Sequence, residues 1–342
     1  MSIRQTFRKQ AEDCAAMGSP LMARLMSGLA EGLQHGTAIA DCILSANDAE
    51  ISRAHALPLR LAGGLHALVL SGQDADLACA YTDPGADITR AALDAIARHP
   101  GFLLDWLHSP PQTNEVRRSA VLIATAHLLT ARFRLPLVLS ELGASAGLNL
   151  LWDHYALHLT AQSFGPSDPA LTLTPWWTGN LPPVATPTIL DRCGVDLNPL
   201  DPVTDRLRLL SYLWPDQPDR IARTRTALDL AARLRPRIDR ADAADWLETR
   251  LATPTPRALH LIFHTVAWQY FPFATQTRAL AAMKSAGAKS PVAQLSMESD
   301  DHTPGAALTL TLWPGGEIIP LGRADIHGRW VDRQLPCPTP HA

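Results

Sequence analysis

The chain has 342 residues, of which 46% are hydrophobic and 18% charged, so it can bury a sizeable core, and this composition argues against global disorder. Its formal charge of −3 lacks the basic excess of proteins that bind nucleic-acid backbone. No apolar run approaches the ~20 residues of a membrane helix, and the first residues hold no apolar signal core. These features predict a cytoplasmic protein that binds neither nucleic acid nor membranes.

The first 118 residues show helical periodicity and no strand pattern. Leu21, Leu25 and Leu29 recur every four residues and mark one apolar face. The predicted helices cover residues 3–34, 58–71, 88–107 and 115–133. The last of them ends before Pro136, because the residue before a proline disfavours the α region. We therefore expect a helical N-terminal cap over residues 1–118.

From Leu135 onward, short apolar runs alternate with helical stretches. The predicted strands are at residues 137–139, 188–190, 259–263 and 292–295, and the predicted helices are at 216–234 and 274–287. Such alternation indicates a mostly parallel sheet. Near the end, Trp313-Pro-Gly-Gly separates two alternating runs and predicts an antiparallel hairpin. The predicted fold class is therefore α/β, with residues 119–342 as the sheet domain and residues 162–187 as an insertion.

A glycine-rich turn follows the first predicted strand, where residues 141–149 read Glu-Leu-Gly-Ala-Ser-Ala-Gly-Leu-Asn. Gly143 and Gly147 would let the backbone turn sharply and approach a ligand closely. Free N–H groups at the start of the helix expected next would favour a carboxylate or phosphate. The Glu141 carboxylate, at the end of the strand, is suited to a ligand's ammonium or hydroxyl group.

A second acid, Asp196, follows the next predicted strand within Gly-Val-Asp-Leu-Asn-Pro. An acid at the end of that strand is the usual partner of a ribose diol. It lies 49 residues after Gly147, rather than the ~20 of the compact motif. The insertion, which carries Trp176-Trp177, accounts for the extra length. The two acids and the turn predict a nucleotide pocket.

The same turn also spells G-x-S-x-G, the nucleophile elbow of serine hydrolases. Ser145 would be the nucleophile, Asp196 the acid, and His264 or His327 the base. Hydrolase elbows follow several earlier strands, whereas the residues before Leu135 are predicted to be helical, which favours the nucleotide interpretation. A third interpretation is that the glycines only allow tight packing of helix on strand.

Several segments resemble an uncharacterised bacterial family, domain of unknown function 2332. They are Gln112–Arg118, Glu141–Leu150, Gly194–Pro199, Trp214–Gln217, Val266–Tyr270 and Leu312–Gly316. Because these segments run through most of the chain, the likeness is specific. The family name carries no function, but its core is similar to a Rossmann-type methyltransferase, an analogy of fold.

This likeness implies S-adenosylmethionine as cofactor. The residues it assigns to cofactor binding are Glu141, Gly143, Ala144, Ser145, Gly147, Asn149, Asp196, Asn198, Asp242 and Ala243. Glu141 and the glycines would lie at the methionine end, Asp196 at the ribose, and Asp242 with Ala243 beside the adenine. Ser145 stands where methyltransferases usually have glycine, and its side chain narrows the cleft.

His264, at the end of the third predicted strand, is the candidate catalytic residue, because histidine titrates near neutrality and can accept a proton from an acceptor. A histidine hydrogen-bonded within the core is the alternative. The residues expected to bind the acceptor are Gln112, Asn114, Glu115, Arg118, Asp153, Trp268 and Tyr270. His154 and His158 share one face of a predicted helix but have no third ligand, and the five cysteines form no C-x-x-C pair, so no metal is expected.

The sequence thus predicts an S-adenosylmethionine-dependent methyltransferase that acts on a small-molecule acceptor. A serine hydrolase that uses Ser145 is one alternative. A non-catalytic ligand-binding protein on a methyltransferase fold is the other. No pattern in the chain indicates its oligomeric state or the identity of the acceptor.

Overall fold

The computed structural model describes residues 2–47, 56–160 and 162–334. The chain forms two compact units. Unit 1 comprises residues 1–113 and 203–225, and unit 2 comprises residues 114–202 and 226–342. Helix α10 (Pro218–Leu234) begins in unit 1 and ends in unit 2.

Unit 1 is helical, as predicted. Its other helices are α1 (Ile3–Ala16), α2 (Pro20–Gly32), α3 (Ala38–Leu44), α4 (Leu57–Leu70), α5 (Ala75–Thr82), α6 (Ile88–Arg98), α7 (Pro100–Leu107) and α9 (Arg206–Ser211). The predicted apolar face is confirmed, since Leu21, Leu25 and Leu29 are all buried in the core of this unit. Trp214, far along the chain, packs into the same core.

Two stretches that were each predicted to be one helix are divided into two helices in the structure. The helix expected over residues 3–34 is broken at Gly18, which has φ +82°. The Ser19 side chain then caps α2 by accepting the N–H of Met22, and Pro20 occupies the first helical position. The helix expected over residues 88–107 is divided at Pro100, whose ring cannot continue α6 but can start α7.

Unit 2 holds a nine-stranded sheet and a small three-stranded sheet. The strands of the large sheet are β1 (Leu137–Leu142), β5 (Trp176–Gly179), β6 (Ile189–Asp196), β7 (Ile238–Arg240), β8 (Leu259–Thr265), β9 (Val292–Glu298), β10 (Ala306–Trp313), β11 (Glu317–Ala324) and β12 (Trp330–Arg333). Their order is β5-β12-β11-β10-β9-β8-β1-β6-β7. The predicted α/β class is confirmed.

Five neighbouring strands of the sheet, in the spatial order β7-β6-β1-β8-β9, are mutually parallel. Every residue of the central strands β1 and β8 is buried. Such strands lie with both faces covered. Strands β9, β10, β11 and β12 pair antiparallel, so the hairpin predicted around Trp313-Pro-Gly-Gly is confirmed as β10 and β11. Strand β5, from the predicted insertion, extends the sheet parallel to β12. The rest of the insertion contributes β3 (Gln162–Phe164) and β4 (Leu171–Leu173), which pair with β2 (Tyr155–Leu159).

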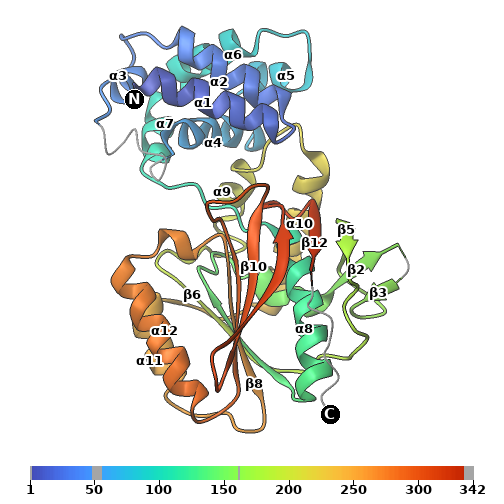
Figure 1. Cartoon of the computed structure of the whole chain (residues 1–342). Helices are drawn as coiled ribbons and strands as arrows, with labels where there is room; N and C mark the ends of the chain where they lie inside the picture. The colour runs from blue at the N-terminus through green and yellow to red at the C-terminus, as the bar shows by residue number, and fades with distance from the viewer. Residues whose placement is uncertain (1, 48–55, 161, 335–342) are drawn as a thin grey trace. The chain divides into compact units, whose positions relative to one another are not determined.

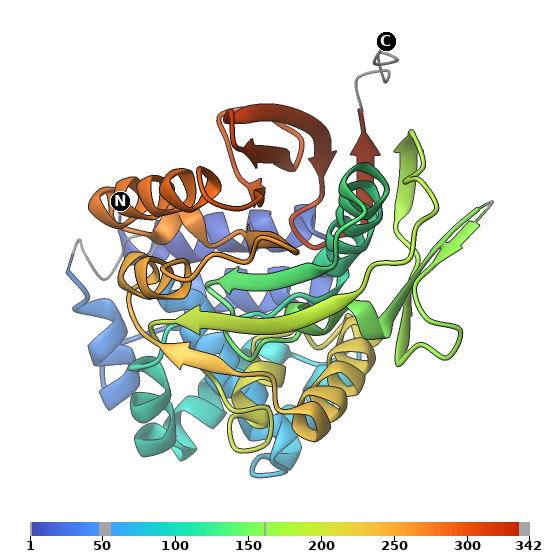
Figure 2. The ribbon, with the colours of Figure 1, turned by 90° about the horizontal axis from the view of Figure 1, so that it is seen from below.

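Helices cover both faces of the parallel strands. Figures 1 and 2 show α11 (Ala243–Arg250) and α12 (Phe273–Gly287), drawn in orange, on one face, and the green α8 (Ser119–Phe133) on the other. The first face includes Leu142 of β1, Leu247 of α11 and Met283 of α12 in one cluster. In the part of the chain that the structure describes, no helix has the length and hydropathy needed to cross a membrane.

Candidate functional site

The carboxyl ends of β1 and β8 meet at a point where the direction of strand addition reverses. From β1 the chain adds β6 and then β7 on one side, and it returns to add β8 on the other side. In open parallel sheets, ligands bind in the crevice outside the carboxyl ends of the strands at such a reversal. Glu141 lies beside Gly194 of β6 and Phe263 of β8 in the strand register, so it stands at this reversal.

The glycine turn lies at the end of β1, as predicted. Gly143 has φ +72° and Gly147 has φ +71°, a region that favours glycine, and Ser145 between them has φ +53°. An α-helix was expected after the turn, and this was wrong. The turn leads instead into η2 (Asn149–His154), a 3₁₀-helix of six residues, and then into β2. The turn therefore has no α-helix behind it to supply a macrodipole.

The N–H groups of the turn are used within the protein. Those of Gly143 and Ala144 both donate to the carbonyl of Val195, at 2.9 and 3.0 Å. The Gly147 N–H donates to the carbonyl of Ala144 at 2.7 Å. The turn is thus closed onto the end of β6, and these N–H groups are not free to cradle a phosphate.

Asp196 completes this closure. One of its carboxylate oxygens accepts the N–H of Ser145 at 2.8 Å, and the other accepts the N–H of Asn198 at 2.8 Å. The Asn198 side-chain oxygen accepts a bond from Arg240 at 3.2 Å. Because a carboxylate has about four lone-pair sites, Asp196 keeps acceptor capacity on each oxygen after these two bonds.

Glu141 is a buried acid with acceptor capacity to spare. Its side chain is 2% exposed, and its Oε2 atom has no hydrogen-bond partner among the described residues. Burial, reinforced by the nearby Asp196 carboxylate, raises the pKa of Glu141 well above its usual value, against the opposing effect of Arg118. A buried acceptor left without a donor is costly, so this oxygen is suited to a ligand's N–H or O–H group.

Ser145 does not form the bonds of a hydrolase nucleophile. Its hydroxyl is buried and has no hydrogen-bond partner in the described part of the chain, so neither His264 nor His327 is bonded to it. The nucleophile and base of a catalytic triad are normally within hydrogen-bond reach of each other. The positive φ of Ser145 is common to both interpretations of the turn.

His264 is 1% exposed and both of its ring nitrogens are hydrogen-bonded. Nδ1 lies 2.8 Å from Oε1 of Glu298, and Nε2 lies 3.0 Å from the amide nitrogen of Gln294. A carboxylate only accepts and an amide nitrogen only donates, so Nδ1 is the donor to Glu298 and Nε2 is the acceptor from Gln294. The ring also stacks on Trp268, with centroids 4.7 Å apart. In this arrangement the His264 side chain links β8 to Glu298 and Gln294 of β9. Its role as a base stays a prediction.

The polar cluster before α8 connects the strand ends. Asn114 accepts the N–H of Leu148 at 2.8 Å, and Glu115 accepts the N–H of Arg117 at 3.1 Å at the start of η1 (Val116–Arg118). Arg118, which is buried, donates at 2.8 Å to the carbonyl of Thr265 at the end of β8. Gln112 belongs to unit 1. Asn114 and Arg118 thus fasten the segment before α8 to the glycine turn and to the end of β8.

Other predicted residues are engaged in structural contacts. Asp242 caps α11 and accepts the hydroxyl of Thr275 at 2.8 Å, and Ala243 begins the helix. Asn149 accepts the hydroxyl of Ser119 at 2.7 Å. Asp153 forms an ion pair with Arg192 through both oxygens, at 2.6 and 2.7 Å. These contacts leave the turn, Glu141 and Asp196 as the residues best placed for a ligand.

His154 and His158 were expected on one helix face, and this was wrong. His154 ends η2, whereas His158 lies in β2 and is bonded to the hydroxyl of Ser163 at 2.7 Å. The described residues contain no group of three or more His, Cys, Asp or Glu side chains that could hold a metal ion. The cysteines that the structure describes are free thiols at positions 14, 42, 79 and 193, and Cys337 lies outside the described residues.

An aromatic loop, residues 266–272, follows β8 and reaches the glycine turn. Val266 has φ +53°, which is unusual for a β-branched residue. A Cβ atom added to Gly143 would lie 2.6 Å from the Cβ of Ala267, so the loop packs directly on the turn. The predicted Trp268 and Tyr270 form η3 (Trp268–Tyr270), and Tyr270 is 66% exposed. The loop therefore places an aromatic side chain, that of Phe271, close to the glycine turn.

Glu298, at the carboxyl end of β9, was missed by the sequence reasoning. Its carboxylate accepts hydrogen bonds from His264 and from two backbone N–H groups of the aromatic loop. The available signal was the one that identified Glu141, namely an acid at the end of a buried apolar run.

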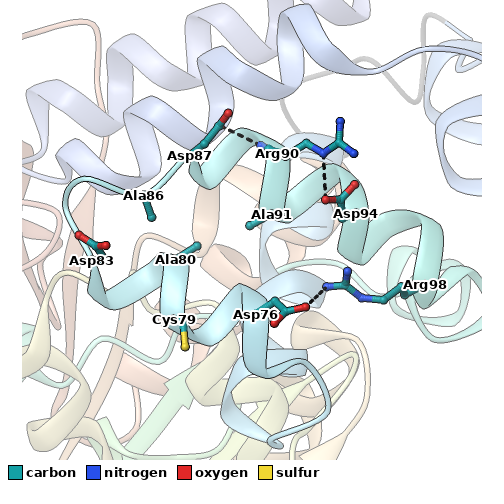
Figure 3. A pocket seen from close by; sticks show the side chains of 10 residues that line it. All are labelled: Asp76, Cys79, Ala80, Asp83, Ala86, Asp87, Arg90, Ala91, Asp94 and Arg98. Carbon is teal, nitrogen blue, oxygen red and sulfur yellow. Dashed lines mark hydrogen bonds and ion pairs between the residues drawn. The ribbon is translucent and has the colours of Figure 1, made fainter.

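Two cavities lie elsewhere among the described residues, and neither is lined by a predicted site residue. One cavity of about 380 Å³ lies between α5 and α6 and is lined by several aspartates, two arginines and Cys79 (Figure 3). Its charges largely pair with one another, since Arg90 bonds to Asp94 at 2.9 Å and Arg98 lies 3.8 Å from Asp76. A second cavity, of about 440 Å³, lies near Pro136 at the amino end of β1. Neither has an unpaired buried charge that would indicate a ligand.

Comparison with known proteins identifies the family. A family model described as "Uncharacterized protein conserved in bacteria (DUF2332)" matches residues 4–333, so the chain belongs to this family and the predicted resemblance is confirmed. No curated protein and no solved structure matches the chain. The glycine turn, Asp196 and Glu298 all lie within the matched range.

Proposed function

We propose that this member of the DUF2332 family is an S-adenosylmethionine-dependent methyltransferase that acts on a small molecule. The observation that carries the proposal is the pair of acids at the ends of two adjacent parallel strands, Glu141 on β1 and Asp196 on β6. Across the sheet the five parallel strands lie in the order β7-β6-β1-β8-β9. Numbered along the chain, this order is 3-2-1-4-5, which is that of doubly wound nucleotide-binding sheets.

The turn favours a nucleoside cofactor without phosphates. Dinucleotides place their pyrophosphate on free N–H groups at a helix N-terminus. Here the N–H groups of Gly143, Ala144 and Ser145 are already bonded to protein acceptors, and no α-helix follows. S-adenosylmethionine carries no phosphate, and its ammonium group and ribose diol need hydrogen-bond acceptors rather than N–H donors.

The residues present fit those groups. Oε2 of Glu141, buried without a partner, would accept from the ammonium group. The unused lone pairs of Asp196 would accept from the ribose hydroxyls. When bound, the cofactor would supply an activated methyl group for in-line transfer, which requires mainly that the acceptor be positioned. The aromatic loop, with Trp268 and Tyr270, would form the wall that positions the acceptor.

The hydrolase alternative receives no comparable support. The Ser145 hydroxyl has no bonded histidine among the described residues, and both nitrogens of His264 are engaged by Glu298 and Gln294. A fluorophosphonate probe should therefore fail to label Ser145. Stoichiometric labelling of Ser145 would favour the hydrolase instead.

Turnover tests the proposal. The protein is incubated with S-adenosylmethionine and a panel of small amines and alcohols, and S-adenosylhomocysteine is measured by mass spectrometry. Wild type should form it above the enzyme-free background, and Glu141→Gln should form at least tenfold less, a loss equivalent to about 1.4 kcal/mol. Glu317→Gln, which alters an exposed acid paired with Arg132, is the matched control and should behave as wild type. Cofactor binding without product over the whole panel would favour a non-catalytic ligand-binding protein.

A further inference from the structure

One oxygen of Glu298 accepts hydrogen bonds from three donors, one on β8 and two on the loop that follows β8. Oε1 lies 2.8 Å from Nδ1 of His264, 3.0 Å from the N–H nitrogen of Ala267 and 3.1 Å from that of Trp268. These bonds fasten the start of the aromatic loop to the end of β9. The carboxylate therefore helps to hold the loop, together with the bond from the Val266 N–H to the carbonyl of Met297 at 2.8 Å, and Val266 itself has a positive φ.

The other oxygen of Glu298 has no partner. Oε2 is buried and makes no hydrogen bond with any described residue, although the side chain as a whole is 12% exposed. Burial tends to raise the pKa of Glu298, but the bonds from His264, Ala267 and Trp268 outweigh it and hold the pKa below its usual value. A buried carboxylate oxygen without a donor is costly, and a cationic donor compensates it best.

The loop bonded to Glu298 contacts the glycine turn and carries aromatic rings. Ala267, which donates to Glu298, is the residue that packs on Gly143 of the turn. Trp268 stacks on His264 and is tilted against Phe271, with centroids 5.7 Å apart. A ligand group bound to Glu298 would thus lie beside aromatic rings and within one loop of the glycine turn.

We propose that Oε2 of Glu298 is a binding site for the amino group of an aromatic amine. The identification of this amine as the methyl acceptor rests on the function proposed above, whereas amine binding itself does not. The carboxylate would accept an N–H of the amine, and the rings of the loop would pack against its aromatic part. Glu298 would also be a positioning residue, since the same side chain holds the loop.

Benzylamine and its neutral counterpart benzyl alcohol are the probes, and binding is measured by ligand-observed NMR without cofactor. Wild type should bind benzylamine at least about tenfold more tightly than benzyl alcohol, because only the amine forms a charge-assisted bond. Glu298→Gln, which keeps an oxygen for the loop, should lose this preference, while Glu317→Gln should retain it. Equal affinity of wild type for both probes, or an unchanged preference in Glu298→Gln, would overturn the proposal.

A second measurement covers the case in which Glu298→Gln does not fold. In wild type, benzylamine should slow hydrogen exchange of the Ala267 and Trp268 amides, and benzyl alcohol should not. Exchange at these amides that is unaffected by benzylamine would contradict a site at Glu298. The proposed methyltransferase function is judged separately by cofactor binding at Glu141, so either proposal can fail while the other stands.

Discussion

The carboxylate of Asp196 accepts the backbone N–H of Ser145 across 2.8 Å, which ties the end of β6 to the turn that follows β1. Asp196, which the sequence assigns to ribose binding, therefore also stabilises the glycine turn. Its second oxygen holds the N–H of Asn198 at the same distance. Because Ser145 is at φ +53°, the turn depends on such outside contacts to keep its shape.

Asp196→Ala should destabilise the protein. The change removes two backbone hydrogen bonds and leaves the N–H of Ser145, in a largely buried turn, without an acceptor, so the loss in free energy of unfolding should be about 1–3 kcal/mol. Chemical denaturation measures it. Asp168→Ala, at an exposed aspartate in unit 2, is the matched control and should change stability by less than about 0.5 kcal/mol. Equal effects of the two substitutions would show that the hydrogen bonds of Asp196 do not stabilise the fold.

Ser145→Gly should stabilise the turn or leave its stability unchanged. A non-glycine residue in the left-handed region costs about 1–2 kcal/mol, which glycine avoids while losing about 0.5–1 kcal/mol in chain entropy. The change also removes a buried hydroxyl that has no partner among the described residues. The same denaturation experiment applies. A loss of more than about 1 kcal/mol would mean that the hydroxyl makes a bond of its own.

Gly143→Ala should destabilise the protein for two separable reasons. Its φ of +72° disfavours alanine, and the new Cβ would lie 2.6 Å from that of Ala267. Gly72 has nearly the same φ, +70°, but nothing within 4 Å of an added Cβ, so Gly72→Ala measures the backbone effect alone. We expect Gly143→Ala to cost at least about 1 kcal/mol more than Gly72→Ala. Combining Gly143→Ala with Ala267→Gly should recover that excess, and no recovery would contradict contact between the loop and the turn.

Acid should weaken the fold through His260. Burial, aided by Arg250, lowers the pKa of His260 to about 3, whereas the unfolded chain has the ordinary value near 6.5. The unfolded state therefore binds more protons below about pH 6.5, and stability falls as the pH drops from there toward about 3. Between pH 7 and pH 5 this one group should remove about 2 kcal/mol. Denaturation curves at the two pH values should differ less for His260→Gln, and an unchanged difference would contradict the assignment.

The sequence predicted most of the parallel sheet, because buried strands such as β1 and β8 appear as continuous apolar runs. It also located Glu141, the glycines and Asp196, since each lies at a strand end within a recognisable turn. The helix breaks at Gly18 and Pro100 were missed, because the apolar periodicity continues across both positions. The packing of Trp214 into the core of unit 1 depends on contacts between distant residues and has no local signal.

Within the candidate site, the sequence could indicate which residues gather but not what they bond. The closure of the turn onto Val195 and Asp196 uses N–H groups that a helix start would have left free. The two partners of His264 come from β9, some 30 residues further along the chain. Bonds of this kind depend on strand register, which the sequence pattern does not specify at the level of single atoms.

Binding of S-adenosylhomocysteine to the wild-type protein, measured by calorimetry, tests the central claim most directly. We expect one site per chain and an affinity that rises with pH, because a bound ammonium favours the ionised form of Glu141, whose pKa is raised in the free protein. Glu141→Gln should weaken binding and remove the pH dependence. Absence of binding at millimolar ligand, or binding that Glu141→Gln leaves unchanged, would contradict a cofactor site at the end of β1.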